Sequence, residues 1–235
     1  MASTVSLPHR LRADDIFFPA MGLLILSIVV IGFGQTYFFA GMLRAKLPNT
    51  LVHIHGAVYV SWILFLTIQP WLIATGRVKW HMRLGVLGVI LPPFMVVLGV
   101  LTVFDFIRRD DGTEISPQLL MAGDFAELAL FVGLTTWGLL VRRHAASHKR
   151  LMILGTMAIL GPAIARWPIT FNPLGIICIQ LALPLLVVLY DLWSNRRIHR
   201  STMIAYAIVV VGLLSALPLS SLAFWQPIIT WIRQS

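Results

Sequence analysis

Charged side chains are scarce in this chain. Asp, Glu, Lys and Arg together make up 11% of its 235 residues, whereas a soluble domain carries roughly 25%. Hydrophobic residues account for 58% of the chain. The shortage of charge together with this excess of apolar residues predicts an integral membrane protein whose main partner is the lipid bilayer.

Several motifs that carry chemistry are also missing. Cys178 is the single cysteine, so an internal disulfide and a cysteine-rich metal motif are both excluded. The sequence has neither a phosphate-binding glycine loop nor a Gly-x-Ser-x-Gly nucleophile motif. These absences argue against nucleotide-dependent and hydrolytic chemistry, and they leave open whether the protein is an enzyme.

Long apolar runs are what the chain does have. Seven segments reach the roughly 20 residues that a helix needs to cross a bilayer, at 16–43, 50–75, 82–105, 117–141, 148–168, 173–193 and 202–224. We therefore expect an all-α bundle of about seven transmembrane helices. A polar segment, 1–15, precedes the bundle, and Trp225 and Trp231 would anchor an interfacial tail at 225–235.

The net charge of +9 follows from topology. The basic residues of the chain fall in short gaps between apolar runs. The chain lacks the aromatic residues on a polar surface with which a nucleic-acid binder stacks bases. Ten lie around the loops after the second, fourth and sixth segments: Arg77, Lys79, Arg83, Arg142, Arg143, Lys149, Arg150, Arg196, Arg197 and Arg200. The alternate loops hold five. Basic loops stay in the cytoplasm, so we expect a cytoplasmic N-terminus.

A weak repeat marks the basic side. The stretches WHMRLGVLGVILPP and SHKRLMILGTMAIL both contain His-x-Arg-Leu at the start of a segment, which indicates related hairpins at 50–105 and 117–168. His81 and His148 would each begin a helix, where the helix dipole favours the neutral ring. A neutral imidazole binds haem iron or a metal ion, so the two are candidate axial ligands of one haem. Alternatively, these His-Lys-Arg positions bind lipid phosphates.

Ionisable residues also occur inside the predicted spans, where they usually mark a functional site. Asp124 and Glu127 are three residues apart and share one helical face. His53 and His55 begin the second segment, in the same half of the bilayer. These four residues are a candidate metal site, with His55 as the inward ring because Tyr59 continues its stripe.

Interpretations without a metal site also remain open for the same residues. The histidines are then hydrated interfacial side chains, and the acids are structural hydrogen-bond partners or proton carriers. Arg166, between two prolines, either neutralises Asp124 or extends to headgroups. Gln69 and Gln180 are expected to donate hydrogen bonds between helices.

Three motifs carry a resemblance: His-Ile-His-Gly at 53–56, His-Met-Arg-Leu-Gly at 81–85 and His-Lys-Arg-Leu-Met at 148–152. Together, over about 50–168, they resemble a family of bacterial multi-pass inner-membrane proteins, which implies a location but no chemistry. A looser likeness is to cytochrome b type membrane proteins, which implies haem b held by histidine pairs near both membrane faces. His81 and His148 fit the inner pair, with His55 as an outer candidate, but Asp124 stands where a second outer histidine is wanted.

Three functions are therefore expected. The first is a redox or cofactor-binding protein that holds haem b or a transition metal. The second is a proton-coupled transporter or small-molecule binding protein that uses the acid pair. The third is a non-catalytic assembly factor for a respiratory membrane complex, because small membrane helpers of haem-copper oxidase assembly also carry histidines at segment ends.

Overall fold

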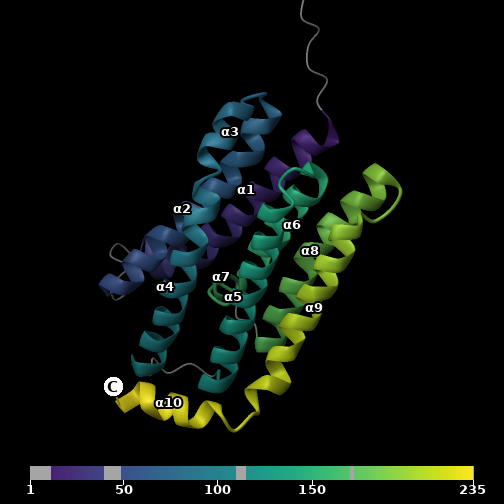
Figure 1. Ribbon diagram of the computed structural model, residues 1–235. Helices are drawn as coiled ribbons and strands as arrows, with labels where there is room; N and C mark the ends of the chain where they lie inside the picture. The colour runs from purple at the N-terminus through teal and green to yellow at the C-terminus, as the bar shows by residue number, and fades with distance from the viewer. Residues whose placement is uncertain (1–11, 40–48, 110–114, 170–171, 235) are drawn as a thin grey trace, which may run out of the picture.

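The computed structural model describes residues 12–39, 49–109, 115–169 and 172–234. These residues contain helices and no strands, which confirms the all-α bundle (Figure 1). The elements in chain order are α1 (Ala13–Phe33), the π-helical turn η1 (Gly34–Phe38), α2 (Thr50–Ala74), α3 (Val78–Leu84), α4 (Leu87–Arg109), α5 (Pro117–Leu140), α6 (Ala145–Met157), α7 (Gly161–Ile164), α8 (Pro173–Asn195), α9 (Arg200–Ser220) and α10 (Trp225–Gln234).

Side-chain caps begin three of the long helices. Asn49, Ser116 and Asn172 each accept a hydrogen bond from the main-chain N–H three residues further on, at 2.9, 3.3 and 2.7 Å. A proline follows two of these caps, where its missing N–H costs nothing and its fixed φ suits the first helical turn. Capping therefore sets where α2, α5 and α8 begin.

Six helices of the described residues are long and apolar enough to cross a membrane. They are 13–38, 50–74, 78–109, 117–140, 173–195 and 200–220. The predicted fifth segment, 148–168, instead forms α6, a break and the short α7. Pro162 contributes to this break, because its ring has no N–H to continue a helix ladder.

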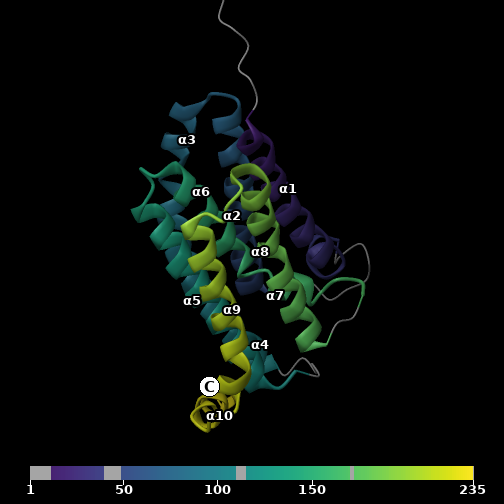
Figure 2. The same ribbon diagram turned by 90° about the vertical axis from the view of Figure 1, so that its right-hand side faces the viewer.

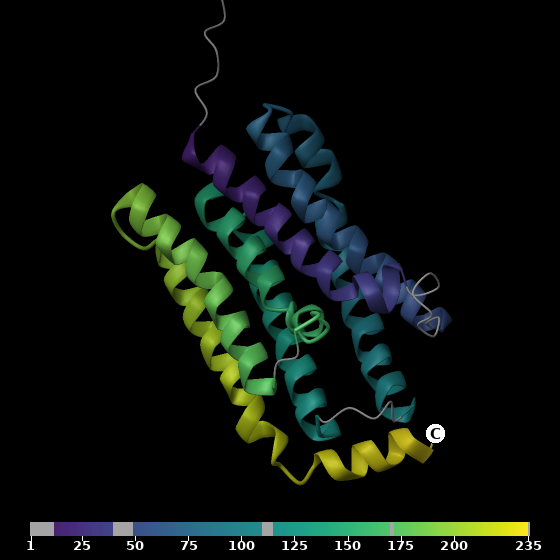
Figure 3. The same cartoon turned by 180° about the vertical axis from the view of Figure 1, so that it is seen from behind.

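The short α6 lies inside the bundle. Every residue from Arg150 to Met157 is buried, and α6 packs against α1, α5, α8 and α9. Seen from behind, α1 crosses the back of the bundle and α7 is a single turn at mid-height (Figure 3). Because protein rather than lipid surrounds α6, its polar groups can find partners on neighbouring helices.

Trp62 of α2 is one anchor of this packing. The side chain is fully buried, and its indole N–H donates to the Thr156 hydroxyl of α6 at 3.1 Å. Its ring meets Phe131 of α5 edge to face, with centroids 5.1 Å apart. This contact fixes the height of α2 relative to α5 and α6.

The two ends of the bundle differ in charge. The turns α2–α3, α5–α6 and α8–α9 lie at the same end as the start of α1 (Figures 1 and 2), and the ten basic residues of the sequence analysis lie in or beside these turns. We call this the basic end. Helix α10 crosses the opposite end, where it packs on α4 and α5 and buries Trp225, Ile229 and Ile232.

Candidate functional site

Two histidine rings meet at the basic end. His81 comes from α3 and His148 from the first turns of α6. Their ring centroids are 6.5 Å apart, and the ring planes are nearly perpendicular, at 83°. Both rings are partly buried. The two His-x-Arg-Leu copies are thus brought side by side, although 67 residues separate their histidines.

The separation of the two rings suits a shared metal ion. An imidazole nitrogen lies about 2 Å from a bound transition metal, and roughly 1.1 Å further brings one to the ring centre, so two rings on opposite sides of one ion have centroids about 6 Å apart. The observed 6.5 Å is close to that value.

One ring is already oriented for ligation. The Nδ1–H of His148 donates to the main-chain carbonyl of Gly138 at 2.8 Å. A carbonyl acceptor fixes the tautomer and leaves Nε2 without a proton, as around metal-bound histidines. Nε2 of His148 is therefore the atom available to a metal.

Unpaired polar atoms occur on the other ring and on Gln69, whose main chain bonds to that ring. Four buried side-chain atoms of the described residues have no hydrogen-bond partner: His55 Nδ1, Gln69 Nε2, Gln69 Oε1 and His81 Nδ1. Three of them belong to Gln69 and His81, and the main chain of Gln69 faces the His81 ring. Buried polar groups are almost always paired, so this concentration indicates a place where a bound group or a small rearrangement satisfies them.

The residues after His148 fasten α6 in place. Lys149 forms an ion pair with Asp14 of α1 at 2.5 Å, and its ammonium lies 4.6 Å from the centre of the Phe18 ring. Arg150 forms a buried ion pair with Asp191 of α8. Three consecutive side chains therefore reach three different neighbours, and Lys149 and Arg150 each pair with a carboxylate of the protein.

Asp191 is the centre of a fully satisfied polar cluster. Its carboxylate is inaccessible to solvent, and besides Arg150 it accepts from the Thr202 hydroxyl at 2.6 Å and the His199 N–H at 3.0 Å. Burial, followed by the charge of Arg150, lowers the pKa of His199, whose neutral Nδ1 accepts from the N–H of Ser201. This cluster holds the first turns of α6 and α9 against the end of α8.

Sequence reasoning missed Asp14 and Asp191. A signal was available for Asp191, which is the single acid within the predicted sixth segment. Asp14 carried no such signal, because it falls in the polar segment expected to precede the bundle. The structure begins α1 at Ala13, so this acid is part of the first helical turn.

The predicted acids lie in the opposite half, on α5. Glu127 is 8% exposed; its Oε1 accepts from the Gln180 amide of α8 at 2.8 Å, and the main chain of Gly161 also bonds to it. A Cβ on Gly161 would collide with this carboxylate. The break before α7 therefore places the main-chain N–H of Gly161 against Glu127. A residue without a Cβ leaves room for this contact, which explains the glycine at position 161.

Asp124 has a different partner from Glu127. It interacts electrostatically with Arg166, as one of the two sequence interpretations expected. The Arg166 guanidinium also donates to the Pro162 carbonyl at 2.7 Å and lies 5.1 Å from the centre of the Phe33 ring. Arg166 is thus held between α1, α5 and α7.

The two histidines near the start of α2 have different surroundings. His53 is exposed and its Nδ1 lies 3.2 Å from the Tyr37 hydroxyl. His55 is more buried and stacks on Tyr59, with centroids 4.0 Å apart, while the Tyr59 hydroxyl donates to the Met95 carbonyl. Within the part of the chain that the structure describes, no three His, Cys, Asp or Glu side chains gather as a metal site.

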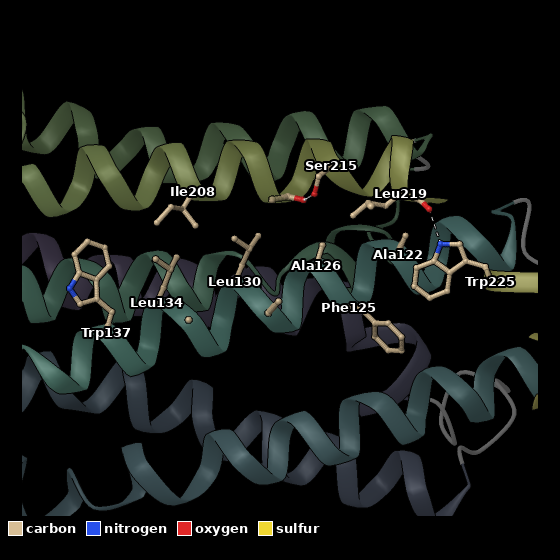
Figure 4. Close-up of a pocket in the computed structure, with 13 residues that line it drawn as sticks. Ala122, Phe125, Ala126, Leu130, Leu134, Trp137, Ile208, Ser215, Leu219 and Trp225 are labelled. Carbon is tan, nitrogen blue, oxygen red and sulfur yellow. Dashed lines mark hydrogen bonds between the residues drawn. The ribbon is translucent and has the colours of Figure 1, made fainter. Parts of the chain in front are cut away.

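An apolar groove of about 560 Å³ lies elsewhere, between α5 and α9 (Figure 4). Trp137 and Trp225 stand at its two ends, and small residues such as Ala126 and Ala122 lie along its floor. None of its lining residues is titratable. The groove is therefore separate from both polar regions.

Comparison of the chain with protein-family models, curated proteins and solved structures gives no significant match. The resemblance to bacterial inner-membrane proteins stays a prediction. Any functional assignment consequently rests on the geometry of this chain's own residues.

Proposed function

We propose that the chain is a membrane haem protein that transfers single electrons, in which His81 and His148 would hold one haem b. The observation that carries this proposal is the perpendicular ring pair at 6.5 Å, in which the buried Nδ1 of His81 has no hydrogen bond of ordinary geometry. A b-type haem in such a site supplies one-electron redox chemistry. By the positive-inside rule, the site lies toward the cytoplasmic side of a bacterial inner membrane.

The ligand set favours haem over a bare ion. A protein-bound transition metal such as zinc usually takes three or four protein ligands, and the described residues offer no group of three. Haem needs only axial ligands from the protein, because the porphyrin supplies the other four nitrogens. Two histidines, one oriented by the Gly138 carbonyl, meet that need.

This chain's residues have separable tasks in the proposed site. His81 and His148 would hold the iron, and the Gly138 carbonyl keeps the proton of His148 on Nδ1. The Arg150–Asp191 pair holds the first turns of α6, so the His148 ring does not rotate with a loose helix end.

The test is the haem content of protein purified from cells supplied with a haem precursor. We expect about one haem per chain, with a Soret band that is lost in His81→Ala and His148→Ala. His144→Ala is the matched control, because His144 lies in the same turn, is exposed and is outside the pair. Colourless wild-type protein contradicts the proposal and favours an assembly factor without a cofactor.

A second candidate, proton-coupled transport, is favoured by one observation. Two carboxyl groups on α5 lie inside the bundle, one held by the amide of Gln180 and the other facing Arg166. Protonation of such acids is a common means of coupling transport to a proton gradient. Proteoliposomes loaded with a pH-sensitive dye test it: wild-type protein should conduct protons, Asp124→Asn should not, and Asp105→Asn serves as the control. Equal flux with and without protein excludes this function.

A further inference from the structure

A second apolar furrow adjoins the groove between α5 and α9. The groove, of about 560 Å³, runs from Trp137 to Trp225 (Figure 4). The second furrow, of about 550 Å³, follows α9. Leu130, Ile208 and Gly212 line both of them, so the two furrows lie side by side.

The length of each furrow is close to the depth of one bilayer leaflet. The groove extends about 16 Å along α5 between Ala126 and Trp137, and the second furrow about 14 Å along α9 between Met203 and Gly212. One leaflet contributes half of the roughly 30 Å hydrocarbon core. A Cβ added at Gly133, in the groove, would meet no atom within 4 Å. Two open apolar furrows of this length fit the two acyl chains of one phospholipid.

Three arginines lie at the level where the furrows reach the basic end. An added Cβ at Gly212 of α9 would collide with Leu130 of α5, so these two residues are level, and the two helices run in opposite directions (Figure 1). Arg200, twelve residues before Gly212, is therefore level with Arg142 and Arg143, which follow Leu130 by about as many. All three arginines are exposed. Among the residues that the structure describes, none of the three pairs with a carboxylate.

Arg200 also lies on the face of α9 that carries the second furrow. Ile204, Ala207 and Val211 line this furrow, and they follow Arg200 by four, seven and eleven residues. This spacing keeps all four side chains on one face of a helix. The guanidinium of Arg200 is thus placed above the furrow, where a lipid headgroup meets its chains.

We propose that α5 and α9 bind one anionic phospholipid, with its acyl chains in the two furrows and its phosphate at Arg200, beside Arg142 and Arg143. Arginine suits this role because its planar fork of N–H donors matches phosphate oxygens. Basic pockets between membrane helices on the cytoplasmic side take anionic headgroups in the same way. The lipid site is independent of the proposed haem site.

The headgroup is tested by native mass spectrometry of delipidated protein in detergent, titrated with dioleoyl phosphatidylglycerol or dioleoyl phosphatidylcholine. The two lipids share their chains and differ in net charge, so the first phosphatidylglycerol should bind more tightly. Arg200→Gln should lower its affinity about fivefold, the usual effect of one cation near an anionic lipid surface, and leave phosphatidylcholine unchanged. Arg77→Gln is the matched control, because it removes an exposed arginine from the α2–α3 turn of the same end.

The chain furrows are tested in the same titration by Gly133→Leu. The new side chain fills the open part of the groove, so the affinity for both lipids should fall. Gly123→Leu is the matched control, because a Cβ at Gly123 also meets nothing within 4 Å and Gly123 lines neither furrow.

The results separate this lipid from other occupants. Equal affinity for the two lipids overturns the proposal and leaves only non-selective lipid around the helices. Equal losses in Arg200→Gln and Arg77→Gln overturn it too, because overall charge then sets the affinity. Unchanged binding in Gly133→Leu contradicts the placement of the chains. Dimers that bind no lipid and dissociate in Gly133→Leu assign the groove to a second copy instead. Losses confined to Arg200→Gln and Gly133→Leu support the site.

Discussion

Ionisable side chains have different partners at the basic end and in the opposite half of the bundle. At the basic end, Lys149 and Arg150 each pair with a carboxylate, and the histidines beside them are left facing each other. In the opposite half, Glu127 is held by the Gln180 amide and the Gly161 main chain. The first region is cross-linked by full charges, whereas Glu127 in the second is held by neutral donors. The ion pairs of the basic end make it rigid, which suits side chains that hold a cofactor. Neutral hydrogen-bond donors tolerate the protonated form of a carboxyl group.

The largest expected effect is at the charged cross-link. Arg150→Met leaves Asp191 buried without its cation, and breaking a buried ion pair costs about 3–5 kcal/mol of unfolding free energy. Arg109→Met removes the partly exposed pair with Asp105 at the opposite end and should cost under about 1 kcal/mol. Reversible unfolding in mild detergent measures both. Equal losses in the two variants contradict the difference between the two ends.

The double variant Arg150→Met, Asp191→Leu sharpens the same comparison. Replacing a whole buried ion pair by apolar side chains is often neutral or stabilising, so much of the lost stability should return. If the pair serves to hold His148, haem affinity should recover less than stability does. Full recovery of both quantities limits the pair to a role in folding.

In the opposite half, the contact between Gly161 and Glu127 is the sensitive point. Gly161→Ala places a methyl group against the Glu127 carboxylate, and overpacking of this kind costs about 1–3 kcal/mol. Gly123→Ala is the matched control, because a Cβ there meets nothing within 4 Å and alanine favours helix by about 1 kcal/mol. Thermal unfolding midpoints distinguish them; a Gly161→Ala protein as stable as wild type contradicts the described contact.

The smallest expected effect is a pH dependence at the basic end. The pKa of His199 is lowered, first by burial and then by Arg150, so the unfolded chain binds this proton more tightly than the folded one. Stability from His199 is therefore present above the unfolded pKa of about 6.5 and is lost as the pH falls through the folded pKa. His199→Asn keeps a capping side chain and should flatten the decline between about pH 7 and pH 5. An unchanged profile excludes His199 as its source.

Hydrophobic periods and lengths were enough to predict the all-α bundle and the position of most helices. The break within 148–168 was harder to predict, because α6 is surrounded by protein, and a helix enclosed in that way need not span the bilayer. The His-x-Arg-Leu repeat predicted that His81 and His148 begin helices on one side, and the structure brings their rings together. The partners of Asp191 and the surroundings of Gln69 depend on which helices become neighbours. A single sequence does not show this locally.

The candidate metal set stays a prediction, and the two histidines in it have different partners. The sequence predicts one half of the bilayer for all four residues of this set, His53, His55, Asp124 and Glu127. In the structure, rotation along α2 directs His53 toward Tyr37 and His55 toward Tyr59. Residues two apart on a helix differ in direction by about 200°.

The most direct test of the central claim is an electron paramagnetic resonance spectrum of the oxidised, haem-loaded protein. Two histidine ligands on one ferric haem give a low-spin signal, and nearly perpendicular ring planes, at 83° here, make that signal strongly anisotropic. The account predicts this spectrum in wild-type protein and its conversion to a high-spin signal in His148→Ala. A high-spin spectrum in wild-type protein, or one unchanged by His148→Ala, would contradict ligation by the His81–His148 pair.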